Sequence, residues 1–379
     1  MAKKSTPPVT ALPADESRGN EITIEQRATE GLSLGTLVRR KFFRHKVAVA
    51  ALFVLGFIVL VAFTSVGTVV GGSGRLVADP ETGRLAVDGF RIAGWWKYNW
   101  YESYALVNPG GAPTLTLWPF AIGEHPFGQD TTGKDIFARV MRGTQQSITV
   151  IVLVGVLSTV IGTTIGATAG YFRGKVDSLL MRGTDVILII PLLVLGAVLG
   201  RSVGGNTIAL GILLGLIAWP LLARLVRAEF LALREREFVD AARVAGAKDG
   251  RIIFRHILPN TVGVIIVNAT LLMSAAILIE TSLSFLGFGV KTPDISLGQI
   301  ISEYQGAFNT RPWLFWWPGL FIIIIALAIN FVGDGLRDAF DPRQKGMPNL
   351  RPLRKQASDL VRGWVAGSRR ERDTTSLRQ

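Results

Sequence analysis

The chain of 379 residues contains no cysteine and only three histidines, His45, His125 and His256. Without cysteine there can be neither a disulfide framework nor a thiolate metal site. None of the histidines has a second ligand at the spacing that is typical of a zinc site. The composition therefore argues against zinc- or histidine-based catalysis, and we assign neither a catalytic nor a metal-binding residue.

The chain also lacks a complete phosphate-binding loop, although Gly128, Gly133 and Lys134 in the stretch GQDTTGKD come close to one. Such a loop needs Ser or Thr after the lysine to hold magnesium, and a strand before it that aims a helix N-terminus at the phosphates. Asp135 occupies the magnesium-ligand position, and no convincing strand precedes it. We therefore expect no cofactor on this chain. If ATP powers the protein, ATP and Mg bind on a partner chain.

Long apolar runs, by contrast, are abundant: 49% of the residues are hydrophobic and the mean hydropathy is +0.38. A spanning helix needs roughly 20 mainly apolar residues to cross a hydrocarbon core of ~30 Å. Six segments qualify, at 47–71, 148–170, 186–200, 206–223, 261–279 and 313–333. The third is short and carries Pro191, which is tolerated where neighbouring helices satisfy the freed carbonyl. The sequence predicts an all-α integral membrane protein with six transmembrane helices.

Lysine and arginine are distributed unevenly between the two sides of these spans. Of the 41 basic residues, 31 lie in the segments on the side of the N-terminus, and the run RRKFFRHK at 39–46 adjoins the first span. Because positive charge is retained in the cytoplasm, we predict that both termini are cytoplasmic. The same asymmetry explains the net charge of +13 without nucleic acid, which we do not expect as a partner.

This topology divides the chain into five parts. They are a cytoplasmic tail (1–46), the first transmembrane helix (47–71), an extracytoplasmic loop with an aromatic-rich insert (72–147), a five-helix core (148–335) and a basic cytoplasmic tail (336–379). The aromatic residues of the insert either lie at the membrane interface, which we favour, or form a docking surface for an external protein; they are Trp95, Trp96, Tyr98, Trp100, Tyr101 and Tyr104.

Two kinds of residue within the spans bear on how the helices pack. Glycines at four-residue spacing, such as Gly162, Gly166 and Gly170, allow close helix approach and indicate a compact bundle, whether its interfaces slide or stay static. Polar groups near the spans are few, and Glu280 and Asp334 fall at predicted helix ends, where capping or solvation accounts for them. With no ladder of buried charges, a proton-coupled carrier or an ion pump is disfavoured.

A charged, helix-prone stretch from Glu237 to Asn260 lies between two spans on the predicted cytoplasmic side. Residues 232–245 favour a helix, and Gly246 suits a C-terminal cap in the left-handed region. A second helix is expected to begin near Asp249 and to end by Leu258, because Pro259 disfavours helix in the residue before it. The apolar residues of the first helix share one broad face and are Leu233, Phe238, Ala241, Ala242 and Ala245.

The pattern of Asp240, Ala241 and Ala242, then Gly246, then Leu258 and Pro259 resembles the E-A-A signature of permease subunits of ABC importers. His256 and Asp240 depart from the family's isoleucine and leading glutamate. Three more stretches resemble the C-type permease of dipeptide and oligopeptide importers, namely 125–147 (HPFGQDTTGKDIFARVMRGTQQS), 280–289 (ETSLSFLGFG) and 333–343 (GDGLRDAFDPR). The resemblance covers roughly residues 125–343 and the first span.

The resemblance implies the type I importer permease bundle in a prokaryotic inner (plasma) membrane. This subunit would form half of the translocation pathway for peptides. Its partners would be a homologous second permease, two cytosolic ATP-binding subunits that carry ATP and Mg, and an extracytoplasmic solute-binding protein. The segment 224–260, here called the coupling loop, would couple the permease to an ATPase through Asp240, Ala241, Ala242, Gly246, Leu258 and Pro259.

Three alternatives remain open at this point. The same family includes permeases for other solutes, such as a nickel chelate. The coupling loop alone could be an amphipathic helix on an anionic lipid surface, although its five acidic residues dilute the positive face. Asp334 and Asp338 could act as acid and base in a membrane-embedded hydrolase. Arg337 and Arg343 lie among these aspartates, so a capped, salt-bridged helix end is the favoured interpretation of that segment.

Overall fold

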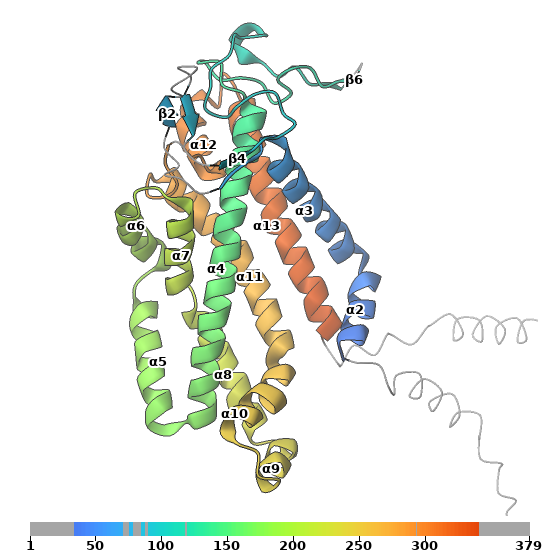
Figure 1. The fold of residues 1–379 in the computed structure, drawn as a ribbon, viewed down its shortest axis with the longest axis vertical. Helices are drawn as coiled ribbons and strands as arrows, with labels where there is room; N and C mark the ends of the chain where they lie inside the picture. The colour runs from blue at the N-terminus through green and yellow to red at the C-terminus, as the bar shows by residue number, and fades with distance from the viewer. Residues whose placement is uncertain are drawn as a thin grey trace, which may run out of the picture.

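The computed structural model describes residues 34–70, 76–78, 85–87, 90–117, 120–292 and 294–340. Within them the chain forms an elongated bundle of helices, with short strands at one end (Figure 1). We call the end that carries the strands and α12 the hairpin end, and the end that carries α9 and α10 the coupling end. Most of both predicted tails, 1–33 and 341–379, lies outside the described residues.

The helices follow the chain order of the predicted spans. They are α2 (Leu34–Arg44), α3 (Lys46–Ser65), α4 (Ile136–Phe172), α5 (Gly174–Ile189), α6 (Leu192–Ser202), α7 (Thr207–Ile217), α8 (Pro220–Arg234), α9 (Glu237–Val244), α10 (Asp249–Arg251), α11 (Leu258–Phe285), α12 (Leu297–Tyr304) and α13 (Trp313–Phe340). Short 3-10 turns lie at Pro109–Gly111 and Gln305–Ala307, and a π-helix at Ile252–Ile257 joins α10 to α11.

In the described part of the predicted external loop, three two-stranded antiparallel sheets interrupt the helical pattern. β1 (Thr68–Val70) pairs with β4 (Phe90–Ile92), β2 (Leu76–Ala78) with β3 (Leu85–Val87), and β5 (Thr116–Leu117) with β6 (Phe120–Ala121). Two-stranded hairpins are marginal in isolation, so these are additions to the bundle rather than a second domain. The bundle itself is all-α, as predicted.

Four helices among the described residues are long and apolar enough to cross a membrane: Lys46–Ser65, Ile136–Phe172, Asp249–Phe285 and Trp313–Phe340. Two bent pairs, α5 with α6 and α7 with α8, meet the same test when each pair is taken as one span. The structure therefore provides between four and six spans, and the predicted count of six is reached when both bent pairs cross.

The third predicted span, 186–200, is not one continuous helix. α5 begins at Gly174 and ends at Ile189, and α6 turns away from it by 83°. Ile190, which precedes Pro191, has extended backbone dihedral angles, as is usual for a residue before proline. The expectation that Pro191 lies inside a spanning helix is therefore wrong, because the proline marks a break. A milder bend of 41° precedes Pro220 at the start of α8.

The glycine row of α4 packs directly against α8. A Cβ atom added to Gly166 would lie 2.4 Å from the carbonyl oxygen of Ala223, and one added to Gly170 would lie 2.6 Å from Cβ of Phe230. Such distances are possible only without a side chain, so the row brings the two helix backbones together. The prediction that these glycines serve compact packing is confirmed.

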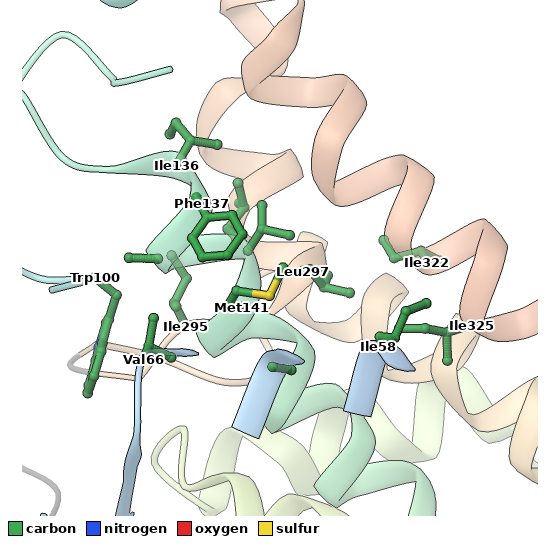
Figure 2. Packing of buried hydrophobic residues seen from close by; sticks show 14 of the residues in the cluster. Ile58, Val66, Trp100, Ile136, Phe137, Met141, Ile295, Leu297, Ile322 and Ile325 are labelled. Atoms are coloured by element: carbon green, nitrogen blue, oxygen red, sulfur yellow. The ribbon is translucent and has the colours of Figure 1, made fainter. Parts of the chain in front are cut away.

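The largest buried cluster lies at the hairpin end, where α3, α4, α12 and α13 meet (Figure 2). Met141 is 1% exposed, and Ile136, Leu297 and Ile325 have no exposed surface. Trp100 is 3% exposed and joins this cluster from the predicted external loop. The cluster therefore fixes the loop onto the start of α4.

The aromatic insert accordingly packs inside the protein. Tyr98 and Trp100 are 8% and 3% exposed, and the Trp96 ring lies 4.4 Å from that of Phe137. The favoured prediction, that these aromatics lie at the membrane interface, is wrong for Tyr98 and Trp100. Trp95, by contrast, is 62% exposed. The signal that was missed is the set of apolar residues at the start of α4, such as Ile136 and Phe137, which are buried by packing against the aromatic side chains of the insert.

Candidate coupling site

Gly246 ends α9 in the way that its sequence position indicates. Its φ angle is +79°, its N–H donates to the carbonyl of Arg243 at 2.9 Å, and the N–H of Ala247 donates to the carbonyl of Ala242 at 3.0 Å. These two bonds form a Schellman motif, which satisfies carbonyls that the helix end leaves free. Ala242 and Gly246 thus act together in one turn, and the predicted left-handed cap is confirmed.

The helix before this turn is shorter than predicted. α8 ends at Arg234, residues 235–236 interrupt the helix, and α9 begins only at Glu237. The expectation of a single helix over 232–245 is therefore wrong. Arg236 has extended dihedral angles and precedes two acidic residues of the first turn, Glu237 and Asp240, whose charge suits a helix N-terminus.

The helix after the turn does not end before Pro259. The chain passes from α10 through the π-helix Ile252–Ile257 into α11, and Asp249–Phe285 forms 37 residues of continuous helix. In an α-helix the ring of Pro259 would clash with the carbonyl four residues earlier, whereas the wider π-turn moves that carbonyl away. The N–H of Leu258 donates to Ile253, five residues back. Leu258 and Pro259 therefore begin α11 instead of ending a separate helix.

One face of the coupling loop is anchored to the bundle. Val239, Ile252 and Ile257 are almost fully buried and pack in one cluster with Phe230 of α8 and Tyr171 of α4. The Tyr171 hydroxyl donates to the Asp249 carboxylate at 2.6 Å, and the Arg234 guanidinium donates to the Tyr171 carbonyl. The loop is therefore held to the ends of two helices and is not a free excursion.

Away from this anchored cluster the coupling loop exposes apolar side chains, here called its apolar face. Val244 is 91% exposed, Phe254 is 72% exposed and Phe238 is 40% exposed, while Ala241 and Ala245 are also exposed. Sequence reasoning did not identify Val244 or Phe254 as functional candidates. Apolar residues beside charged ones in a polar segment, as Val244 is beside Arg243 and Phe254 beside Arg255, are the signal that would have found them.

Asp240 makes a weaker contribution to this site than its motif position suggests. Its carboxylate accepts a hydrogen bond from Arg243 at 2.8 Å, three residues along α9, and both side chains are more than a third exposed. Such exposed helical pairs contribute only about 0.3–0.5 kcal/mol. Of the predicted site residues, Ala241, Ala242 and Gly246 lie on or beside the apolar face, whereas Asp240 lies at its charged edge.

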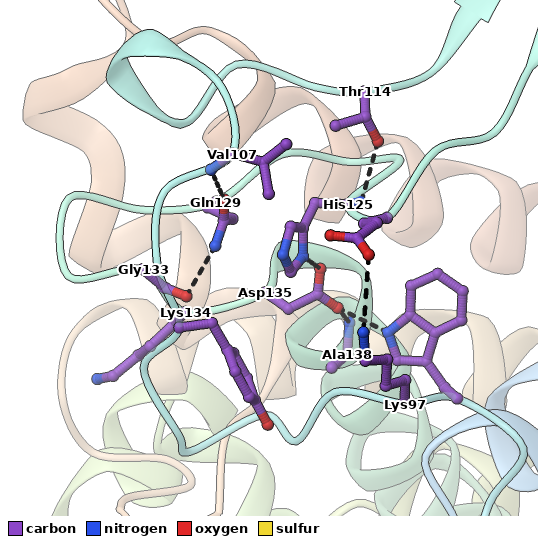
Figure 3. Close-up of polar contacts among 12 residues, drawn as sticks. Lys97, Val107, Thr114, His125, Gln129, Gly133, Lys134, Asp135 and Ala138 are labelled. Carbon is purple, nitrogen blue, oxygen red and sulfur yellow. Dashed lines mark hydrogen bonds and ion pairs between the residues drawn. The ribbon is translucent and has the colours of Figure 1, made fainter.

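The hairpin end holds a second polar cluster, at the start of α4 (Figure 3). Asp135 caps the helix by accepting a bond from the N–H of Ala138 at 2.8 Å, and it also contacts Nδ1 of His125 and Nε1 of Trp96, each at 2.8 Å. Asp135 is fully buried. This is the residue that excluded a phosphate loop, and its position shows that the GQDTTGKD stretch is built to begin a helix.

Asp130 is held by the same stretch. Burial by itself would raise the pKa of this carboxyl, but hydrogen bonds from the Lys134 N–H, the Tyr304 hydroxyl and Thr132, with the charge of Arg139, hold the pKa below its usual value. The Tyr304 hydroxyl donates to Asp130 at 2.8 Å. Asp130 therefore stays ionised inside the protein and links the external loop to α12.

Glu280 does not lie at a solvated helix end. It is fully buried inside α11 and accepts hydrogen bonds from Ser284 at 2.7 Å and from Ser147 of α4 at 2.9 Å. The prediction that Glu280 lies at a helix end, where capping or solvation would account for it, is thus wrong, because its helix continues to Phe285. The carboxylate instead joins α11 to α4 at the hairpin end.

The chain is similar to a known family of membrane proteins. Residues 162–346 match the family described as binding-protein-dependent transport system inner membrane component. Residues 33–68 match the N-terminal TM domain of oligopeptide transport permease C. The oligopeptide transport system permease protein OppC of Haemophilus influenzae is 34% identical over 91% of this chain and 100% of its own length. The chain belongs to this permease family.

Other members of the family align with similar breadth. OppC of Mycobacterium bovis is 35% identical over 84% of this chain and 98% of its own length, and OppC of Escherichia coli K12 is 35% identical over 85% and 95%. A chain of the MetNI methionine ABC transporter, solved in an inward-facing conformation, is 20% identical with a TM-score of 0.45, covering 54% of this chain and 98% of its own. The family match and the OppC relatives make this permease a multi-pass membrane component of an ABC importer, as its motifs predicted.

The aspartates of the alternative hydrolase lie in different surroundings within the permease. Asp338 is 3.5 Å from Nε2 of His45, which joins α13 to the start of α3, whereas Asp334 is exposed. His45 is thus one ionic contact of Asp338, and Arg343 lies outside the described residues. Within residues 34–340 as described, no three His, Asp or Glu side chains form a group that could hold a metal ion.

Proposed function

We propose that this permease is the transmembrane subunit of an ATP-driven importer of peptides, and that it couples to a cytosolic ATPase through the turn at Gly246. It would form half of the translocation pathway beside a second, homologous permease. Two ATP-binding subunits would carry ATP and Mg, and an extracytoplasmic solute-binding protein would deliver the peptide. The names of the relatives, which are oligopeptide transport permeases, support peptide as the cargo.

The observation that carries this proposal is the exposed apolar face of the coupling loop. Val244 and Phe254 are exposed in the coupling loop, and the charged residues Arg243, Lys248 and Arg255 near them in the sequence suit an aqueous rather than a lipid environment. Leaving such side chains in water is unfavourable, and patches of this kind mark contacts with other proteins. A short helix with alanines and a sharp turn fits a groove on a partner.

The path from this face into the membrane supports a mechanical role. The 37 residues of Asp249–Phe285 form continuous helix, and at 1.5 Å per residue they extend about 55 Å. A displacement at the coupling end therefore reaches the hairpin end without an intervening loop. The π-helix at Ile252–Ile257 is the point at which α10 can change its angle to α11, since π-turns interrupt the regular hydrogen-bond ladder. Closure of the ATPases would tilt this helix and alternate access.

The orientation of the molecule belongs to the same proposal. The coupling end faces the cytoplasm, where the ATPases lie, and the hairpin end faces the solute-binding protein. The excess of basic residues in the segments on the side of the N-terminus supports this direction. The location is the inner membrane of a prokaryote.

Reconstitution of the complete importer in liposomes tests the function. We expect uptake of trialanine that requires ATP, the ATPase subunits and the solute-binding protein together, while the permease alone transports and hydrolyses nothing. Uptake of a nickel chelate but not of any peptide would exclude the peptide assignment. Turnover of a substrate by the isolated permease would exclude the importer assignment altogether.

A further inference from the structure

A cavity of about 420 Å³ opens at the hairpin end, away from the coupling loop. Its walls come from the start of α4, from the loop after α11 and from α12, and they include Trp100, Lys134, Lys291, Asp294, Gln299 and Glu303. Its volume lies in the range of sites for small ligands, which is roughly 300–1,000 Å³. The cavity combines an aromatic wall with several charged groups, which is the usual construction of a site for a polar ligand.

The carboxylates of this cavity are already neutralised. Asp294 accepts bonds from Arg142 at 2.9 Å and from Gln146 at 3.1 Å, and Glu303 accepts bonds from Arg139. Arg142 also lies over the ring of Trp100, at 4.7 Å from its centre. These pairs make the acidic side of the cavity a fixed scaffold and leave its remaining charge positive.

That remaining charge comes from Lys134 and Lys291. Within the described residues neither ammonium group has a carboxylate oxygen within 4.0 Å. Lys134 is half-buried and its side chain points away from the His125–Asp135 cluster (Figure 3). Two cations that line one cavity, beside carboxylates that are engaged elsewhere, favour an anionic ligand.

We propose that this cavity binds the C-terminal end of the cargo peptide, an assignment that rests on the proposed function. The terminal carboxylate lies between Lys134 and Lys291, and the last side chain packs against Tyr101, which lines the same cavity and is partly exposed. Every peptide with a free C-terminus offers this carboxylate, whatever its sequence. The cavity thus accepts peptides by their ends, on the side where the binding protein releases them.

The test uses the full importer in liposomes, with trialanine and its C-terminal amide as probes. The double variant Lys134→Gln, Lys291→Gln is compared with wild type and with Lys97→Gln. The Lys97 side chain is 74% exposed, is paired with Glu124 and does not line the cavity. We expect the double variant to raise KM for trialanine about tenfold, corresponding to one lost charge-assisted bond. KM for the amide should be high in wild type and unchanged in the double variant, and Lys97→Gln should match wild type.

The possible results separate the site from the function. If wild type transports trialanine and the double variant does so with the same KM, the cavity assignment is wrong while the importer stands. If wild type transports no peptide, the proposed function itself is wrong. If the double variant loses binding of the peptide-free solute-binding protein, the lysines form a protein contact, and the peptide assignment is overturned. Direct binding of trialanine to the permease–ATPase complex, weakened about tenfold by the double variant, supports it.

Discussion

The two ends of this permease treat their side chains in opposite ways. At the hairpin end, charged groups are buried and paired: Asp135, Asp130 and Arg139 are each less than 5% exposed. At the coupling end, apolar groups are exposed, with Val244 at 91% and Phe254 at 72%. Each arrangement is unfavourable by itself, since buried charges need partners and exposed apolar groups prefer burial.

The difference shows where the side chains of each end find the partners that they need. The buried charges Asp135, Asp130 and Arg139 of the hairpin end find their partners within the chain, in α4, α12 and the external loop. The apolar face of the coupling end is completed only by another subunit. Substitutions at the hairpin end should therefore reduce the stability of the permease, and those at the coupling end should reduce assembly or coupling while leaving its stability intact.

The largest effect is expected for Asp135→Ala. It removes the cap of α4 and leaves the N–H groups of Trp96 and Ala138 buried without an acceptor. The free energy of unfolding should fall by about 3–5 kcal/mol. Thermal unfolding of the purified permease measures this loss. Asp334→Ala, at an exposed aspartate, is the control and should unfold like wild type; similar behaviour of both variants would contradict the contrast between the ends.

Gly246→Val should abolish coupling without unfolding the permease. A residue with a side chain at φ of +79° is strained by about 1–2 kcal/mol, and a β-branched residue more so, although no atom of this chain lies within 4 Å of the added Cβ. We expect uptake to fall at least tenfold while ATP hydrolysis continues.

Gly246→Asn is the matched control, because asparagine tolerates the left-handed region better than other residues with side chains. It should retain most of the uptake. Gly250→Ala changes a nearby glycine without a positive φ angle and should behave like wild type. Equal loss of uptake in all three variants would show that the turn geometry is not what matters.

Phe254→Ser should weaken the permease–ATPase complex about tenfold, which corresponds to 1.4 kcal/mol and is typical of an apolar contact at an interface. Its thermal stability should not change, because 72% of the side chain is exposed. Pull-down of ATPase subunits across a range of concentrations measures the affinity. Phe120→Ser, at a side chain that is 71% exposed at the hairpin end, should leave ATPase binding unchanged. Unaltered affinity of Phe254→Ser would remove this residue from the interface.

Asp130→Asn should change how stability depends on pH. The pKa of Asp130 is lower in the folded protein than in the unfolded chain, so ionised Asp130 stabilises the fold above pH ~4 and this contribution is lost as the pH falls through the folded pKa. The variant should therefore be less stable than wild type at pH 7, and the difference should shrink below pH ~4. Thermal unfolding from pH 3 to pH 7 measures both. A difference that grows with acidity would contradict the sign.

The smallest effect is expected for Asp240→Asn. The pair with Arg243 is exposed and contributes only about 0.3–0.5 kcal/mol. Uptake and stability should remain within about twofold of wild type. A tenfold fall in uptake would show that Asp240 contacts a partner directly. The surface that binds the ATPase would then include the first turn of α9.

The elements that the sequence predicted well are those with a local cause. Gly246 had to end a helix because its neighbours favour helix and only glycine enters the left-handed region cheaply. The apolar runs of α3 and α13 were visible because lipid requires about 20 apolar residues wherever a helix crosses.

The wrong predictions concern residues whose structure depends on tertiary contacts or on the surrounding backbone and not on the local sequence. Pro191 breaks its span, whereas Pro259 does not, because the π-helix Ile252–Ile257 makes room for its ring. Position relative to a proline cannot distinguish these outcomes. The burial of Glu280 depends on Ser147, more than a hundred residues away in the chain, and no pattern near Glu280 reveals that partner.

The absence of cysteine makes one measurement especially direct. A single cysteine is introduced by Val244→Cys at the coupling end or by Phe120→Cys at the hairpin end, and the assembled importer is treated with a short thiol–amine cross-linker. The proposed coupling site predicts that the Val244→Cys permease is joined to an ATPase subunit and that the Phe120→Cys permease is not. Cross-linking of Phe120→Cys to the ATPase, or its absence in Val244→Cys, would contradict the coupling role of the turn at Gly246.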